Sequence, residues 1–107
     1  MAHFYTYETK PLTISFTPTD VLDSYKKIVI SFEQGGVLVN KFEDDLEIDT
    51  ENGKISLNLS QEETSKFHEG DAKVQVNIYY DFSERDVSKK ATIEVRDNLY
   101  KKVINDE

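Results

Sequence analysis

Six acidic residues lie close together in the sequence with no basic residue among them: Glu43, Asp44, Asp45, Glu47, Asp49 and Glu51. Carboxylate oxygens bind Ca²⁺, but the calcium loop of an EF-hand also needs a glycine at its sixth position. Counted from Asp44 or Asp45, the sixth residue is Asp49 or Thr50, so the run does not fit that loop. In a strand, Asp45, Glu47 and Asp49 would share one face at a spacing of about 7 Å, which is typical of a solvated surface. We predict no metal site, and the sequence leaves open whether residues 43–51 bind a cation.

Other residue types that carry chemistry are few. The chain has no cysteine, which excludes disulfides, thiolate metal sites and cysteine nucleophiles. Its two histidines, His3 and His68, do not form a pair at metal-ligand spacing. Gly35-Gly36 is not followed by the Lys-Ser or Lys-Thr of a phosphate-binding loop. We therefore predict no catalytic residue and no cofactor, and we expect that the protein is not an enzyme.

The aromatic residues, six Tyr and six Phe, are the remaining candidates for a binding role. Alternation with polar neighbours predicts that one group fills the core: Phe16, Phe32, Phe67, Tyr80 and Phe82. A second group is expected to point outward, and it comprises Tyr5, Tyr7, Tyr79 and Tyr100. Tyrosine combines a large contact area with a polar tip, so these four are candidate residues of a protein interface. A surface that stacks sugars is the alternative use of the same side chains.

The clearest structural elements surround residues 55–82. Two runs alternate apolar and polar residues and predict half-buried strands: one carries Ile55, Leu57 and Leu59, the other Val74, Val76, Ile78 and Tyr80. Between them, Ser60 and Glu63 have the spacing of a capping box, which predicts a helix that begins at Gln61. We expect one short helical turn near residues 61–67, ended by Gly70.

Further apolar alternation predicts strands near residues 12–16, 28–33, 37–42, 46–48 and 91–95. Gly35-Gly36 predicts a tight hairpin turn, and Asn52-Gly53 predicts a turn before residue 55. The count is about seven strands, with no regular alternation of strands and helices. This pattern predicts an all-β protein, an antiparallel β-sandwich of immunoglobulin-like size, with a small barrel as the competing arrangement.

The length of 107 residues suits one domain, so we expect a single β-sandwich domain over residues 1–107. Residues 1–10 alternate weakly and are expected to form an edge strand or an N-terminal arm that reaches a neighbour. Residues 81–86 are expected to be a polar connection. Residues 99–104 suit one to two helical turns or a terminal strand, and residues 105–107 should fray.

The chain carries 13 basic and 21 acidic side chains, a net charge of −8. Such a charge repels phosphate backbones and anionic lipids, which argues against nucleic acid and membranes as partners. No apolar run approaches the roughly 18–20 residues that span a bilayer, and the N-terminus lacks a basic segment followed by an apolar one. We expect a soluble protein without a signal peptide or transmembrane segment, and no small-molecule substrate.

Several short segments together carry a resemblance to a known group of proteins. In chain order they are SFEQGG (31–36), DLEI (45–48), LNLSQEET (57–64), Phe67, Gly70, VQV (74–76), Ser88, DNL (97–99) and VI (103–104). The chain resembles small uncharacterised β-sandwich proteins encoded in phages and prophages of Gram-positive bacteria, among genes for virion structure. The resemblance covers residues 28–104 and includes no catalytic motif. The connection at residues 81–90 departs from it because it contains no glycine.

The resemblance implies a non-enzymatic structural or assembly module of a phage or prophage that acts through protein–protein contacts, in the tail, baseplate or a related virion component. It implies other virion proteins, or further copies of the chain in a homo-oligomer, as partners. It also implies a location in the host cytoplasm during assembly and then in the virion. The alternative is a small carbohydrate- or ligand-binding β-sandwich module, which exposed tyrosines would serve.

Overall fold

The structure, a computed structural model, describes residues 2–17, 22–81, 84–87 and 90–104. Within these ranges the chain forms nine strands, one helical turn and one 3-10 turn. In chain order they are β1 (His3–Tyr5), β2 (Lys10–Ser15), β3 (Lys27–Gln34), β4 (Val37–Phe42), η2 (Glu43–Asp45), β5 (Leu46–Asp49), β6 (Lys54–Leu59), α1 (Gln61–Thr64), β7 (Gly70–Tyr79), β8 (Arg85–Val87) and β9 (Ala91–Arg96). The predicted all-β class is confirmed.

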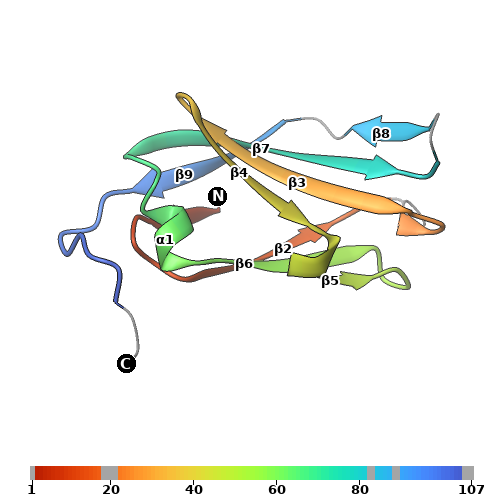
Figure 1. Cartoon of the computed structure of the whole chain (residues 1–107), viewed down its shortest axis with the longest axis horizontal. Coiled ribbons are helices and arrows are strands. Elements are labelled where there is room, and N and C mark those ends of the chain that lie inside the picture. The colour runs from red at the N-terminus through yellow and green to blue at the C-terminus, as the bar shows by residue number, and fades with distance from the viewer. Residues whose placement is uncertain (1, 18–21, 82–83, 88–89, 105–107) are drawn as a thin grey trace.

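Two sheets face each other, as Figure 1 shows. The larger sheet has the strand order β1-β9-β7-β3-β4, with the short β8 paired to β7, and the smaller sheet has the order β2-β6-β5. Neighbouring strands are antiparallel except β1 and β9, which are parallel. The predicted two-layer sandwich is therefore confirmed, and residues 3–5 form an edge strand on their own chain.

The two sheets are joined on one side by a short connection. β4 continues through η2 directly into β5, so the β4 edge of the larger sheet and the β5 edge of the smaller sheet lie on the same side. Among the described strands, the larger sheet has five along its path and the smaller sheet three. On the opposite side, β1 and β9 consequently extend past β2.

The core lies between the sheets, because alternate side chains of each long strand point inward. Its buried apolar side chains are Phe4, Leu22, Ile28, Ile30, Phe32, Val39, Ile55, Leu57, Leu59, Phe67, Ala72, Val76, Ile78, Ile93 and Val95. The predicted inner faces of β6 and β7 are correct. Phe32 and Phe67 are buried as predicted, Phe16 and Tyr80 pack at the margin of the core, and Phe82 lies outside the described residues.

The predicted hairpin turn joins β3 to β4. Gly35 and Gly36 have φ angles of 48° and 92°, a left-handed conformation that glycine adopts without steric cost. Gln34 and Val37 face each other across the turn, which fixes the register of both strands. Gly53, with φ of 64°, has the same role before β6.

The helical turn is shorter than predicted. α1 ends at Thr64 with Ser65 as its C-cap, and Gly70 is the first residue of β7 rather than the end of a helix. Phe67 is 4% exposed, and its ring contacts Phe4 with 5.5 Å between the ring centroids. Burial of this ring draws the chain into the core before a second helical turn can form.

Two further expectations need correction. The polar connection contains a strand, β8, whose three residues are all exposed and so give no apolar alternation to detect. Residues 99–104 form neither helical turns nor a strand. Their backbone bonds instead go to the side chains of Asn98 and Gln61.

Candidate interaction surfaces

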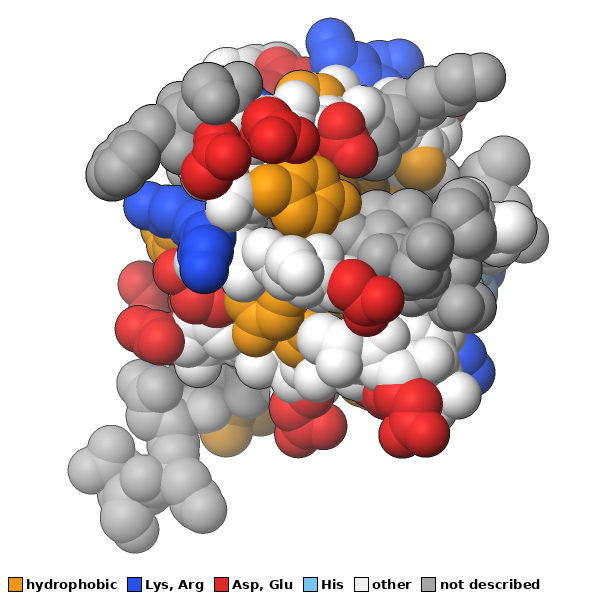
Figure 2. Space-filling model, turned by 90° about the vertical axis from the view of Figure 1, so that its right-hand side faces the viewer, with side chains coloured by type: hydrophobic (Ala, Val, Ile, Leu, Met, Phe, Trp, Pro, Cys, Tyr) orange, Lys and Arg blue, Asp and Glu red, His pale blue; other side chains and the backbone are white. Residues whose placement is uncertain are grey.

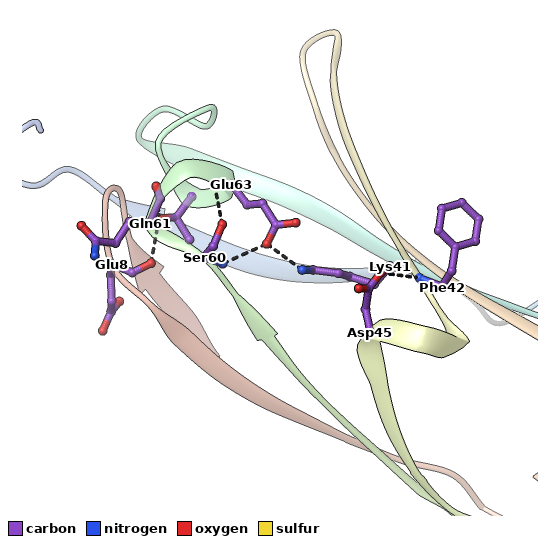
Figure 3. Close-up of polar contacts among 8 residues, drawn as sticks. Glu8, Lys41, Phe42, Asp45, Ser60, Gln61 and Glu63 are labelled. Carbon is purple, nitrogen blue, oxygen red and sulfur yellow. Dashed lines mark hydrogen bonds and ion pairs between the residues drawn. The ribbon is translucent and has the colours of Figure 1, made fainter. Parts of the chain in front are cut away.

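The helical turn α1 begins with the predicted capping box, shown in Figure 3. The backbone N–H of Glu63 donates to Ser60 Oγ over 3.1 Å, and the backbone N–H of Ser60 donates to Glu63 Oε1 over 2.9 Å. Both N–H groups would otherwise lack a partner at the start of the helix. Because β6 ends at Leu59, the box fixes how the chain leaves the smaller sheet.

An ion pair connects this box to the edge of the larger sheet. Lys41 Nζ lies 2.7 Å from Glu63 Oε1, and the two side chains are only 11% and 24% exposed. Burial acts to raise the pKa of Glu63, but hydrogen bonds from Lys41 and Ser60 outweigh it and lower the pKa below its ordinary value. β4 and α1 are thus held together by an ionised carboxylate.

Thr64 closes the opposite side of α1. Its hydroxyl is fully buried and donates to the carbonyl oxygen of Glu8 over 2.8 Å. The bond ties the helical turn to the connection between β1 and β2. This bond and the contact between Phe67 and Phe4 hold α1 and Phe67 over the end of β1 and β9 that projects past the smaller sheet.

The C-terminal segment, residues 99–104, leaves β9 and runs beside α1 (Figure 1). It carries four of the eight large apolar side chains that the described residues leave exposed: Leu99, Tyr100, Val103 and Ile104. Leu99 is fully exposed. At its start, Asn98 Nδ2 donates to the carbonyl oxygen of Thr6 and Lys101 Nζ lies 3.1 Å from Asp97 Oδ2. At its end, Gln61 exchanges two hydrogen bonds with the backbone of Ile104. The segment is an exposed arm of four apolar residues and two lysines, attached to α1 through Gln61.

A second apolar surface lies at the β2 edge of the smaller sheet, and we call it the β2 groove. It has a volume of about 300 Å³ and opens between β2 and the inner face of the larger sheet. Its lining includes Leu12, Ile14 and Phe16 on one wall and Val74, Val76, Ala91 and Ile93 on the other, and the described lining residues include no charged side chain. Leu12, Ile14 and Phe16 are only half-buried, because no described strand lies beyond β2.

The acidic run lies along the β5 side. Three of its carboxylates bind backbone N–H groups: Glu43 accepts from Ile28, Asp45 from Phe42, and Asp49 from Asn52. Hydrogen bonds from the side chain and backbone of Asn52 lower the pKa of Asp49. Among the described residues, no three His, Cys, Asp or Glu side chains are grouped so that they could hold a metal ion. Asp45 and Asp49 therefore stabilise local turns, and Glu43 connects η2 to β3.

Acidic side chains are also frequent where β7 ends and β3 begins. Figure 2 shows this end of the sandwich, with Asp and Glu side chains around small apolar patches. Basic side chains are present on the same face but are fewer. A field of this sign repels a second acidic protein that approaches this end.

The structure brings three of the four candidate tyrosines to one end. Tyr5 is exposed on β1, with its ring centroid 6.0 Å from the guanidinium of Arg96, and Tyr7 follows it. The backbone N–H of Tyr100 donates to the side chain of Asn98, and Asn98 is in turn bonded to Thr6, the residue after Tyr5. Tyr79 ends β7 nine residues beyond Gly70, about 30 Å away along the strand, and its ring contacts Arg85. The four do not form one patch.

The two histidines have unrelated surroundings. His3 lies on β1 with its ring 6.0 Å from that of Tyr5, whereas the side chain of His68 is exposed beyond α1. The backbone of His68 is bonded at both N–H and C=O by the side chain of Gln34, which is 5% exposed. Gln34 was not among the predicted site residues, although its inward position after Ile28, Ile30 and Phe32 in the β3 alternation signals a buried polar group.

No protein-family model matches the chain, and no curated protein matches it in sequence. Among the described residues, no helix combines the length and the apolar character that crossing a membrane requires. The C-terminal segment and the β2 groove are consequently the features on which a function can be based.

Proposed function

We propose that this chain is a non-enzymatic structural or assembly module of a phage or prophage virion, in the tail, baseplate or a related component. The observation that carries the proposal is the C-terminal segment, in which four of six side chains are large, apolar and exposed. Burying one Leu or Ile side chain stabilises a complex by about 1.5–3 kcal/mol. A neighbouring protein that covers this segment therefore gains a strong contact.

The virion setting is supported by the resemblance of residues 28–104 to phage and prophage proteins. A small β-domain with an exposed apolar segment suits a component that acts through contacts with neighbouring proteins. Its partners are other virion proteins or further copies of itself. It is located in the host cytoplasm during assembly and afterwards in the virion.

The alternative, a carbohydrate- or ligand-binding module, has weaker support. Sugar binding by stacking requires several exposed aromatic rings on one surface, yet of the three candidate tyrosines at the β1 end only Tyr5 and Tyr100 are exposed, and Tyr7 is half-buried. The aromatic residues that line the β2 groove are Phe16 and Phe32, of which Phe32 is fully buried. The groove offers apolar walls and few polar groups that could orient a sugar.

The test is co-expression of the chain, with an affinity tag at its N-terminus, together with the proteins encoded beside its gene. We expect at least one of them to co-purify, and we expect the chain to be present in assembled particles seen by electron microscopy. The double variant Val103→Asp/Ile104→Asp should lower the yield of the complex at least tenfold. Leu38→Asp/Val87→Asp is the matched control, because it places the same charge at two exposed apolar positions outside the segment. Failure of every neighbour to bind, with no chain in particles, would contradict the proposal.

A further inference from the structure

We propose that the β2 groove binds the C-terminal segment of a second copy of the chain as an added strand, so that copies join head to tail. The inference rests on the proposed assembly function and names both its partner and its site. Addition of an extended segment to an exposed sheet edge is an established mode of recognition, in which backbone hydrogen bonds give affinity and alternate side chains give specificity.

The strand order limits the occupant to a single extended segment. β9 and β1 project two strands past β2, a width of about 10 Å, and would collide with the sheets of a second whole domain that approached β2 edge to edge. The space beneath the projecting strands has room for one added strand beside β2. Only a segment that can leave the surface of its own domain can enter it.

The length of the groove fits the segment. Phe67 and α1 already cover Phe4 at one end of the projecting strands. The uncovered part runs beside residues 12–16 of β2, about 16 Å of extended chain. Residues 99–104 span about 20 Å when extended.

The segment has the composition of an added strand. In an extended chain, Leu99 and Val103 point to one face and Tyr100 and Ile104 to the other. Either pair would place two apolar side chains against the groove. The lysine between the members of each pair can lay its apolar stem along the wall with its ammonium group at the rim.

Charge favours this segment over the rest of the chain. Two copies, each with a net charge of −8, repel one another, whereas residues 99–104 contain two lysines and no acidic residue. β2 has no acidic side chain that could attract the lysines of the segment into a shifted strand register. Its one charged residue is Lys10 at its start. Lys101 Nζ lies 3.1 Å from Asp97 Oδ2 in its own chain, so the segment carries little net charge and adds no acidic side chain to a contact between two acidic copies.

Release of the segment from its own domain has a small cost. It is held there by an exposed pair of hydrogen bonds between Gln61 and Ile104, and it contributes no residue to the core. The contacts of Asn98 with Thr6 and of Lys101 with Asp97 lie at the start of the segment and can persist when residues 103–104 move away. Because the donor and acceptor surfaces differ, the contact is heterologous and produces a ring if the rotation closes and a filament if it does not.

The test measures solution mass by analytical ultracentrifugation up to about 1 mM for the full chain and two variants. The arm variant is Val103→Asp/Ile104→Asp, and the groove variant is Ala91→Trp, which adds a large side chain at an exposed position that lines the groove. We expect mass to rise with concentration in the full chain, and each variant to raise the dissociation constant at least tenfold. Leu38→Asp/Val87→Asp and Leu38→Trp are the matched controls and should associate like the full chain.

A mixture of the two variants gives the sharpest result. The arm variant keeps an open groove and the groove variant keeps an intact segment, so the mixture should form a 1:1 dimer and nothing larger. An isologous contact, or insertion of the segment into the groove of its own chain, predicts no such dimer. Monomers throughout the concentration series, undiminished association of either variant, or no dimer in the mixture would each overturn the inference.

Failure of this inference is distinguishable from failure of the assembly role. If the chain co-purifies with a neighbouring protein but never self-associates, the assembly role stands and the second copy is the wrong partner. If the two variants form a dimer but no neighbouring protein binds and no particle contains the chain, the contact stands and the virion role fails.

Discussion

The two edges of the smaller sheet differ in how they are protected. On the β5 side, the connection through η2 joins the sheets, and the exposed Glu47 and Asp49 put charge along a strand of only four residues. On the β2 side, a strand of six residues presents Thr13 and Ser15 outward and leaves an apolar groove beneath its edge. Natural sheets protect their free edges with charge, short strands or a covering element. The β5 edge has these protections, whereas β2 has only Lys10 and Pro11 at its start, so the part of its edge after Pro11 is available for pairing.

The larger sheet shows the same contrast. Near α1, its β4 edge is held by the ion pair between Lys41 and Glu63, and Phe4 is covered by Phe67. Near the start of β9, Ala91 is exposed at the groove. The chain itself thus covers the projecting strands near α1, and it leaves the part near Ala91 uncovered.

The largest expected effect is a loss of stability, and it should be greater on the central strand of the smaller sheet than on its open edge. Leu57→Ala on β6 should lower the free energy of unfolding by about 2–4 kcal/mol. Leu57 is buried, so the shorter side chain would leave a cavity that the surrounding core fills only in part. Ile14→Ala on β2 should cost about half as much, because Ile14 is half-buried. Urea denaturation followed by far-ultraviolet circular dichroism of dilute protein measures both. Equal losses would show that β2 is as well covered as β6.

The next effect concerns the ion pair on the closed side and depends on pH. The folded state lowers the pKa of Glu63, so the ionised carboxylate stabilises the protein above the unfolded pKa of about 4.5. This contribution is lost as the pH falls through the folded pKa. Glu63→Gln should therefore lower the free energy of unfolding at pH 7, and its difference from the unsubstituted chain should shrink as the pH decreases from about 5 to 3.

Glu62→Gln is the matched control for this prediction, because it makes the same charge change at an exposed neighbouring position. Its effect should be small and should change little with pH. A difference for Glu63→Gln that is constant from pH 7 to pH 3 would show that the carboxylate charge does not support the closed side.

The helix cap should have a smaller effect. Ser60→Ala removes the oxygen that accepts the N–H of Glu63 and should cost about 1 kcal/mol. Ser15→Ala, at an outward position on the open edge, should change the free energy of unfolding by less than about 0.5 kcal/mol. Thermal unfolding of the two variants gives the comparison, and similar shifts of Tm would exclude a specific role for the cap.

The smallest effects on folding are expected from new charges at the two edges. Thr13→Lys on β2 and Glu47→Lys on β5 should each change stability by less than about 0.5 kcal/mol, because both side chains are exposed. Their effects on self-association should differ: a lysine on β2 protects the open edge and should weaken it at least tenfold. Sedimentation of Glu47→Lys should resemble that of the unsubstituted chain, and the reverse result would place the contact at β5.

Local spacing in the sequence was sufficient for the elements whose geometry is local. Ser60 and Glu63 predicted the cap, Gly35-Gly36 predicted the hairpin, and the alternation around Leu57 and Val76 predicted the inner faces of β6 and β7. These features depend on residues a few positions apart, for which side-chain direction follows from the backbone period.

The β2 groove could not be predicted in this way, because it depends on which strands lie side by side. Leu12, Ile14 and Phe16 alternate as cleanly as the residues of β6, and only the strand order shows that one row is buried and the other half-covered. The tyrosines show the same limit, because outward direction alone did not indicate that Tyr79 lies at the other end of the sandwich from Tyr5.

The most direct test is an NMR titration of the isotope-labelled Val103→Asp/Ile104→Asp chain with the peptide NLYKKVI, the sequence of residues 98–104. An added strand at the open edge should shift the amide signals of β2 and of the first residues of β9, and Ala91→Trp introduced into the labelled chain should abolish these shifts. An unchanged spectrum, or shifts confined to Gln61 and its neighbours in α1, would contradict the assignment of the β2 groove as the binding site of the C-terminal segment.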